Sequence, residues 1–230
     1  MRVQQQQSWV LHTRPYRESS LLLELFTRDH GRVALVAKGV RGKKNATPPR
    51  QFVQALASWV GRGPLFTLTE CELSAGLGLQ GDALACGFYV NELLLRMLEP
   101  LDVHESLFAT YTRTIEQLTS DRSHSATLRV FEHELLRECG YAPDFGFTWQ
   151  TGEPIRADRH YQLQSERGFV EVHKSDSSVS GEQLIAISAS DFTSPAVRKA
   201  ARQLFASALR PHLGQKPLAS RDLLRPQART

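Results

Sequence analysis

The hydrophobic period of the sequence changes near Gly81, and this change constrains the fold more than any other feature. Before it, turn residues separate short apolar or alternating segments, at Ser8–His12, Ser20–Thr27, Arg32–Ala37, Phe52–Val60 and Leu65–Leu73. Such segments are typical of β-strands. Because five short strands would leave exposed edges in an open sheet, they favour closure into a small barrel. The pattern predicts a five-stranded oligonucleotide-binding (OB) β-barrel over residues 1–80.

After Gly81 the apolar residues recur at helical spacing. The spacing predicts a helix that reaches Pro100, a second over Leu107–Leu118, and a third that Gly140 ends in the C′ position. Residues 143–160 are rich in Pro, Gly and Thr, which indicates a loop.

Two further elements are expected beyond this loop. Tyr161–Gln164 and Phe169–His173 flank a turn with Gly168, which predicts an isolated β-hairpin. Ser194 and Pro195 form an N-cap and N1 pair that opens a last helix. The predicted fold class is therefore α+β, with an OB-fold domain at 1–80 and a mainly α-helical domain at 81–230 that carries a small β-hairpin near 160–173.

Charge is segregated along the chain, although the net charge is only +4. Residues 1–80 hold 11 Lys and Arg against 5 Asp and Glu, and residues 195–230 hold 8 against 1, whereas residues 81–194 hold 9 against 18. Basic surfaces concentrate polyanions, so both ends of the chain are candidates for nucleic-acid contact. The alternative is that these stretches do not gather into surface patches.

A basic loop over Lys38–Arg50 carries five positive residues and no negative one. Such a loop can follow a phosphate backbone, because Lys and Arg displace condensed counterions without a fixed geometry. The turn after the first strand adds positive charge. The predicted DNA-binding residues are Arg14, Arg17, Lys38, Arg41, Lys43, Lys44 and Arg50. The alternative interpretation is a solvated turn.

Three aromatic residues near this loop have two possible roles. Tyr16, Phe52 and Trp59 are candidates to stack on bases. Barrel cores also need aromatic side chains, and for Phe52 and Trp59 we expect the core.

A second basic group covers the last helix and the segment after it. These residues contact either nucleic acid or the acidic tail of a partner, and charge alone does not choose because phosphate and carboxylate both suit Arg. A solvated helix face is the third interpretation. The residues are Arg198, Lys199, Arg202, Arg210, Lys216 and Arg221.

Motifs of enzymes, metal sites and membrane spans are weak or missing. Gly76–Gly81 matches G-x-G-x-x-G, but no β-α-β unit surrounds it, so we interpret it as a linker. There is no nucleophile elbow, P-loop or H-E-x-x-H motif. Cys71, Cys86 and Cys139 are too far apart for a metal knuckle, so we expect reduced thiols. Without an apolar run near the roughly 20 residues of a membrane span, or a signal peptide, we expect a cytoplasmic protein.

Four segments resemble the RecO family of bacterial recombination mediators, in order along nearly the whole chain. They are Trp9–Ser20 (WVLHTRPYRESS), Gly31–Arg41 (GRVALVAKGVR), Tyr89–Leu94 (YVNELL) and Pro211–Arg221 (PHLGQKPLASR). Several segments in the right order are more specific than any one of them. The sequence is most similar to the proteobacterial branch.

The resemblance implies a protein that binds single- and double-stranded DNA and anneals complementary strands. It also implies two partners, RecR and the acidic, apolar C-terminal tail of single-stranded-DNA-binding protein (SSB). With them the family helps to load RecA onto SSB-coated DNA in the RecF pathway. The family's helical domain docks the SSB tail, and Arg129 matches a basic position implicated there. The expected protein is a monomer when alone, works at the nucleoid and has no cofactor.

One stretch departs from the family pattern. Many members bind a structural zinc through cysteines in the helical domain, but the corresponding Thr148–Pro154 has no Cys. We therefore expect no metal, and we expect Trp149 to supply part of the packing that holds this stretch.

The predicted function is non-enzymatic, because neutralised phosphate charge is enough to let two complementary strands approach. Two other functions stay open. An RNA-binding OB-fold adaptor would prefer RNA to DNA of the same sequence. A metal-dependent nuclease, with carboxylates from the acidic middle of the chain, would cleave DNA in Mg²⁺.

Overall fold

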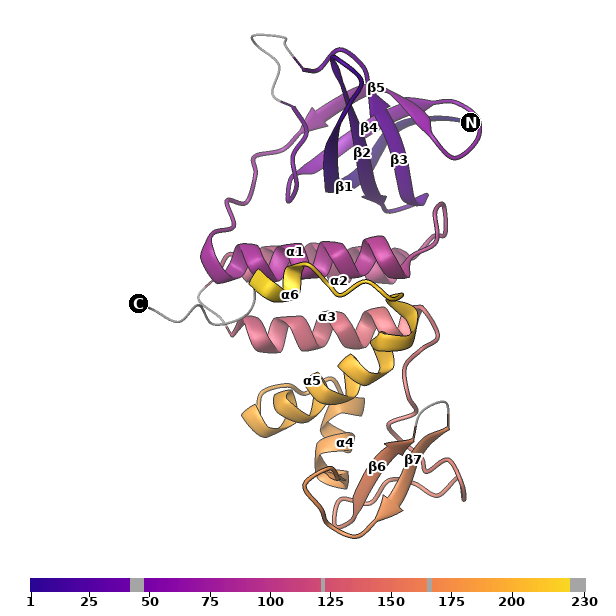
Figure 1. Cartoon of the computed structure of the whole chain (residues 1–230), viewed down its shortest axis with the longest axis vertical. Helices are drawn as coiled ribbons and strands as arrows, with labels where there is room; N and C mark the ends of the chain where they lie inside the picture. The colour runs from indigo at the N-terminus through magenta and orange to yellow at the C-terminus, as the bar shows by residue number, and fades with distance from the viewer. Residues whose placement is uncertain (42–47, 121–122, 165–166, 224–230) are drawn as a thin grey trace. The chain divides into compact units, whose positions relative to one another are not determined.

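A computed structural model describes residues 1–41, 48–120, 123–164 and 167–223. The chain divides into two units, one of residues 1–122 with 217–230 and one of residues 123–216. The first unit holds the β-barrel and two long helices, and the second holds the remaining long helices and a small sheet (Figure 1). Whether residues 1–80 form an independent domain stays a prediction.

Five strands close the predicted barrel in the order β1-β2-β3-β5-β4. They are β1 (Arg2–Tyr16), β2 (Ser20–Thr27), β3 (Gly31–Ala37), β4 (Gln54–Val60) and β5 (Phe66–Leu73). β1 closes the barrel because its first half pairs with β4 and its second half with β2. The predicted fold class, an OB-like barrel followed by helices and a small sheet, is confirmed.

The prediction that the first strand begins at Ser8 is wrong, since β1 begins at Arg2. The polar run Gln4–Gln7 hides the strand, because it shows no alternation of apolar residues. A β-bulge explains this pattern. The register shifts between Val3 and Gln6, and Gln5 between them has a φ of 47°.

The barrel interior follows from the period of two along β2 and β3. Leu21, Leu23 and Leu25 pack inward against the apolar residues of β3 and against Trp59. The expectation that Trp59 and Phe52 belong to the core is confirmed, since they are 0% and 6% exposed.

Two helices pack on the barrel within the first unit, α1 (Gly81–Met97) and α2 (Glu105–Leu118). The amide Nδ2 of Asn91 donates to the carbonyl of Leu11 over 2.8 Å, and the hydroxyl of Tyr111 donates to Oδ1 of Asn91 over 2.7 Å. Burial raises the pKa of Tyr111, so its hydroxyl stays protonated. This buried network fixes the helices to β1.

The short helix α6 (Ser220–Leu223) is held by Glu92 of α1. The carboxylate accepts from the Ala219 amide over 3.1 Å, from the Ser220 amide over 2.9 Å and from the Ser220 hydroxyl over 2.6 Å. Burial acts to raise the pKa of Glu92, but the hydrogen bonds from Ser220 and Ala219 and the charge of Arg96 lower it overall. Glu92 belongs to the segment Tyr89–Leu94 and Ser220 to the segment Pro211–Arg221, so two of the four segments that resemble the family are in contact here.

The second unit combines helices with a sheet in the order β7-β6-β8. Its elements are α3 (His124–Glu138), β6 (His160–Gln164), β7 (Gly168–Val172), β8 (Val179–Ser180), α4 (Gly181–Ser188), α5 (Pro195–Leu209) and the 3₁₀ turn η1 (Arg210–His212). The predicted hairpin is confirmed as β6 and β7. The predicted end of one helix is confirmed, because Gly140 follows α3 with a φ of 72°. The predicted start of another is also confirmed, because Pro195 is the first residue of α5.

Two features of this unit differ from the predictions. The sequence analysis missed α4, because eight residues are too few to show a helical period. The available signal was the capping box of Ser180 and Gln183, in which each side chain binds the other residue's amide. Trp149 is 52% exposed, so it supplies little of the packing that was expected of it. Buried Phe145 and Ile155 flank its loop instead.

Candidate nucleic-acid interface

Basic side chains gather where the β1–β2 turn meets the end of β3. In the sheet, Tyr16 pairs with Ser20 and Leu21 pairs with Ala37, so this turn and Lys38 lie at the same end of three neighbouring strands. Five of the seven predicted DNA-binding residues are described, and all five are exposed. We call them the basic rim: Arg14, Arg17, Lys38, Arg41 and Arg50. The other two, Lys43 and Lys44, lie outside the described residues.

The loop after β3 is bonded to the β1–β2 turn. The amide of Arg41 donates to the carbonyl of Ser19 over 2.9 Å, and Nη1 of Arg41 donates to the carbonyl of Arg17 over 3.3 Å. Arg17 has a φ of 52°, and its guanidinium lies over the ring of Tyr16, 5.3 Å from the centroid. The chain thus brings Arg17 and Arg41 together from positions 24 residues apart.

The far end of the basic loop returns to β1. The amide of Phe52 donates to the carbonyl of Val10 over 3.3 Å, and Nε2 of Gln51 lies 3.4 Å from Nδ1 of His12. Arg50 precedes these contacts and is exposed. The described ends of the loop are therefore attached to β1, which carries Arg14, and to the turn after it, which carries Arg17.

Arg14 lies on the outer wall of the barrel. It pairs with Leu22, which in turn pairs with Val36. Because Leu21 and Leu23 belong to the interior cluster, Leu22 and the residues paired with it face outward. OB-folds bind oligonucleotides on the face of strands 2 and 3 and on the loop between strands 1 and 2. The basic rim includes the loop between strands 1 and 2, whereas the outward side chains of Leu22 and Val36 on strands 2 and 3 are buried.

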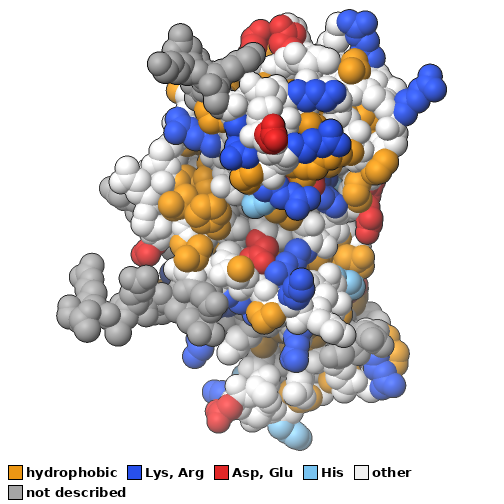
Figure 2. Space-filling view, turned by 45° about the horizontal axis from the view of Figure 1, so that its top comes forward, with side chains coloured by type: hydrophobic (Ala, Val, Ile, Leu, Met, Phe, Trp, Pro, Cys, Tyr) orange, Lys and Arg blue, Asp and Glu red, His pale blue; other side chains and the backbone are white. Residues whose placement is uncertain are grey.

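The basic rim has one acidic neighbour in the β1–β2 turn, the exposed Glu18. Among the described residues, no Asp or Glu forms an ion pair with a member of the rim. Other arginines of the barrel are paired, since Arg32 lies 3.0 Å from Glu24 and Arg28 lies 2.8 Å from Asp29. Figure 2 shows several Lys and Arg side chains over the barrel, with few acidic side chains between them.

Arg198, in the second predicted group, has a structural contact. Its Nη1 donates to the carbonyls of Phe192 and Thr193, in the turn that precedes α5. The other residues of the group are exposed, but they do not all belong to one unit. Lys199, Arg202, Arg210 and Lys216 are in the second unit, whereas Arg221 is in the first.

Arg129 lies on α3 and is 5% exposed. Its Nη2 forms an ion pair with Glu132, which is also buried, and its Nε has no hydrogen-bond partner among the described residues. A partner could reach this guanidinium only if the surface around it opened. A contact of Arg129 with the SSB tail stays a prediction.

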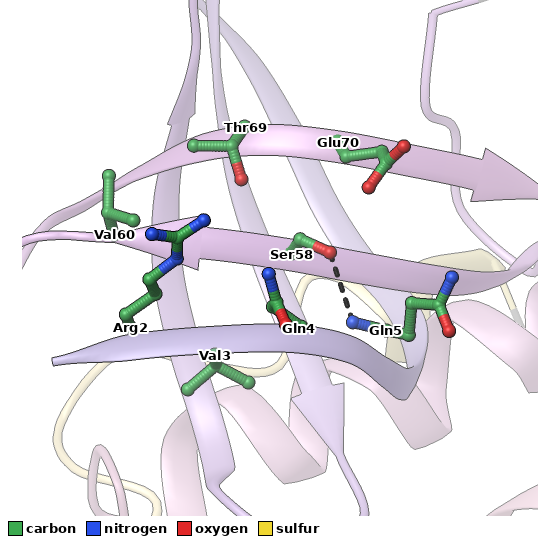
Figure 3. A pocket seen from close by; sticks show the side chains of 8 residues that line it. All are labelled: Arg2, Val3, Gln4, Gln5, Ser58, Val60, Thr69 and Glu70. Atoms are coloured by element: carbon green, nitrogen blue, oxygen red, sulfur yellow. Dashed lines mark hydrogen bonds between the residues drawn. The ribbon is translucent and has the colours of Figure 1, made fainter.

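A shallow pocket lies on a different wall of the barrel, formed by β1, β4 and β5 (Figure 3). Its lining contains none of the predicted residues. Arg2 reaches across β4 at one end of this pocket, and Glu70 lies at the other end.

Sequence analysis missed two exposed arginines of the barrel. Arg2 begins β1, where it pairs with Val60, and Arg62 lies in the β4–β5 turn two residues after Val60. The loop between strands 4 and 5 is a second binding element of OB-folds, so the turn Gly61–Pro64 was the available signal.

The described residues lack two other features, a cluster of metal ligands and a membrane-spanning helix. Within the described ranges, no group of three or more His, Cys, Asp or Glu could hold a metal ion. No helix in the same ranges is both long enough and apolar enough to span a membrane.

Nearly the whole chain is similar to known proteins. Residues 1–77 match the family model of the recombination protein O N-terminal domain, and residues 79–222 match that of its C-terminal domain. The chain is 42% identical to the DNA repair protein RecO of Actinobacillus succinogenes over 95% of this chain and 94% of the relative. It is 41% identical to proteins of the same name from Haemophilus influenzae and Vibrio cholerae, over 97% and 98% of this chain and 96% and 97% of the relatives. The chain therefore belongs to the RecO family of DNA repair proteins.

Proposed function

We propose that the chain binds single- and double-stranded DNA through the basic rim and anneals complementary strands. The observation that carries this proposal is the set of exposed, unpaired cations that the Arg41 hydrogen bonds hold beside the β1–β2 turn. Lys and Arg bind phosphates and release counterions, which depends little on base sequence. The rim therefore suits a protein that must act on any DNA sequence.

Annealing follows from the same electrostatics. Two complementary single strands repel each other because each carries a phosphate charge per nucleotide. Exposed cations of the rim lower this repulsion without occupying the base edges, so the bases stay available for pairing. No covalent step is needed, and we propose that the protein acts without catalysis.

The proposed partners are RecR and the C-terminal tail of SSB, with which the chain would help to load RecA onto SSB-coated DNA in the RecF pathway. Membership of the RecO family supports this proposal. The exposed cations Lys199, Arg202 and Arg210 of the second unit offer charge that suits an acidic tail. Since the substrate is chromosomal DNA, we place the protein at the nucleoid in the cytoplasm, as a monomer when alone.

The test is equilibrium binding of a labelled oligonucleotide over a range of salt concentrations. The variant replaces Lys38, Arg41, Lys43 and Lys44 by Ala. The matched control replaces four exposed, ion-paired arginines by Ala, which are Arg28, Arg137, Arg156 and Arg159. Each lost phosphate contact should reduce the slope of log K against log salt by about 0.9 on duplex DNA and about 0.7 on single strands. A slope equal to that of the wild type would exclude these four residues of the basic loop as phosphate contacts and contradict the proposed DNA site.

The same assay separates the two other functions. An RNA adaptor would bind an RNA oligonucleotide clearly more tightly than DNA of the same sequence, because it would contact the 2′-hydroxyl groups. A nuclease would shorten labelled DNA in the presence of Mg²⁺. Our proposal expects no preference for RNA and full-length DNA after incubation.

A further inference from the structure

Two large aromatic side chains project from one loop of the second unit. Phe147 is 51% exposed and Trp149 is 52% exposed, while Thr148 between them is buried. Phe147 and Thr148 are extended, since they form β-bridges with Pro154 and Phe169, and a turn begins at Trp149. We call these two exposed rings, of Phe147 and Trp149, the aromatic surface.

The small sheet holds this surface in place. The amide of Trp149 donates to the carbonyl of Phe169 over 2.9 Å, and the amide of Thr148 donates to the carbonyl of Glu153 over 2.9 Å. A Cβ atom at Gly168, which has a φ of 127°, would lie 3.2 Å from Cβ of Trp149. The backbone of β7 thus passes close to Trp149. These contacts fix the position of the Trp149 side chain without a bound ligand.

A flat cation lies beside the ring. The guanidinium of Arg167 is 5.4 Å from the centroid of the Trp149 ring, and Arg167 is exposed. Two carboxylates of the same sheet region are already paired, since Asp158 lies 3.2 Å from Arg156 and Glu171 lies 3.2 Å from Arg159. Exposed aromatic rings with a neighbouring guanidinium are the groups on which unpaired bases stack.

We propose that Phe147, Trp149 and Arg167 form a second contact for single-stranded DNA, in which bases stack on the two rings. The inference rests on the proposed function, because it assumes that the protein binds DNA. The two contacts differ in what they recognise. The basic rim recognises phosphate in single strands and duplexes alike, whereas the aromatic surface needs bases that are free of a partner strand.

Trp149 reports on this contact by its own fluorescence. The other two tryptophans, Trp9 and Trp59, are 1% and 0% exposed in the first unit, so a ligand that stacks on the surface quenches mainly Trp149. We expect a thymine homopolymer to quench the emission of the wild-type protein. The same titration of Trp149→Phe should show little quenching.

Affinity measurements give the second readout. Trp149→Ala should bind single-stranded DNA about tenfold more weakly, and Trp149→Phe should stay close to the wild type because the ring is kept. Affinity for a duplex should not change. The slope of log K against log salt should also stay the same, since no phosphate contact is removed. The matched control is Ile185→Ala, which removes an apolar side chain that is 45% exposed in the same unit.

Several results would overturn the inference. They are unchanged single-strand affinity of Trp149→Ala, an equal loss for duplex DNA, or emission that responds to SSB protein but not to an oligonucleotide. Should Trp149→Ala fail to fold, Arg167→Gln and Phe147→Ala provide the same comparison, with single-strand affinity below the wild type expected for both. Failure of the proposed function is a separate result, in which the rim variant keeps the salt slope of the wild type.

Discussion

The guanidinium of Arg41 donates a hydrogen bond to the backbone carbonyl of Arg17, 3.3 Å away, and so joins the loop after β3 to the β1–β2 turn. The contact leaves both side chains exposed. It places two positive charges on the part of the barrel where OB-folds bind oligonucleotides. The hydrogen bond makes Arg41 an anchor of the loop, and the proposed DNA binding adds a second role as a cation for phosphate.

Replacing Arg41 by Lys should separate these roles. Lysine keeps the charge but lacks the planar fork of the guanidinium, so it does not reproduce the hydrogen bond to Arg17 with the same geometry. We expect Arg41→Lys to keep the wild-type salt slope, while Arg41→Ala loses about one unit of slope. Filter binding of a labelled oligonucleotide from low to moderate salt measures both. Equal slopes for Arg41→Ala and the wild type would show that Arg41 contacts no phosphate.

Asn91 should be required for stability of the first unit. In Asn91→Ala, the buried hydroxyl of Tyr111 and the carbonyl of Leu11 both lose a partner. An unsatisfied buried group costs about 1–3 kcal/mol, so the variant should unfold at a clearly lower denaturant concentration. Chemical unfolding measures this change, with the exposed Gln117→Ala as control. A midpoint equal to that of the wild type would mean that the network contributes nothing.

Docking of α6 should depend on the charge of Glu92. Its folded-state pKa is lowered, so the stabilisation is present above the unfolded-state pKa and is lost as pH falls through the folded-state pKa. Relative to the intrinsic exchange rate at the same pH, we expect amides of residues 219–223 to be less protected in Glu92→Gln at neutral pH, and in the wild type at acid pH. Hydrogen exchange read by mass spectrometry tests both. Protection that does not differ between Glu92→Gln and the wild type would contradict this role.

The second unit should be less stable in mild acid because of His133. Its ring stacks on Phe205 with centroids 5.6 Å apart, and its Nδ1 lies 2.9 Å from the hydroxyl of Ser190. Burial lowers the pKa of His133, with a smaller opposing effect of Glu134. Stability is therefore full above the unfolded-state pKa of about 6.5 and falls as pH decreases below it.

Replacing His133 by Gln should remove part of this pH dependence. Urea unfolding at pH 7.5 and pH 5.5 measures it, and the loss of stability on acidification should be smaller in the variant than in the wild type. The same loss in both proteins would assign the effect to another group.

The sequence predicts the barrel well because its strands carry strong local patterns. The short apolar runs of β2 and β3, and turns such as Gly61–Pro64, are visible without the structure. The bulge at Gln5 and the short helix α4 are not, because each departs from a regular period or is too brief to show one. Local pattern therefore determines the elements, while their irregularities depend on tertiary pairing.

The site was less predictable than the fold. The run of Lys and Arg in the sequence indicates the basic loop. Only the structure shows that Arg14 faces outward, by its strand register, and that Arg41 donates a hydrogen bond to Arg17. Charge also gives no information on burial, so it does not reveal the paired, buried state of Arg129. The exposure of Trp149 was equally hidden, since a tryptophan in a loop is compatible with either core or surface.

Strand annealing with oligonucleotides coated by the cognate SSB tests the central claim most directly. The assay compares SSB with and without its acidic C-terminal tail, and compares the wild type with the variant that replaces Lys38, Arg41, Lys43 and Lys44 by Ala. Our account predicts rapid annealing by the wild type on tailed SSB, slower annealing without the tail, and loss of annealing in the variant. Annealing of bare DNA but never of coated DNA, or a variant as active as the wild type, would contradict it.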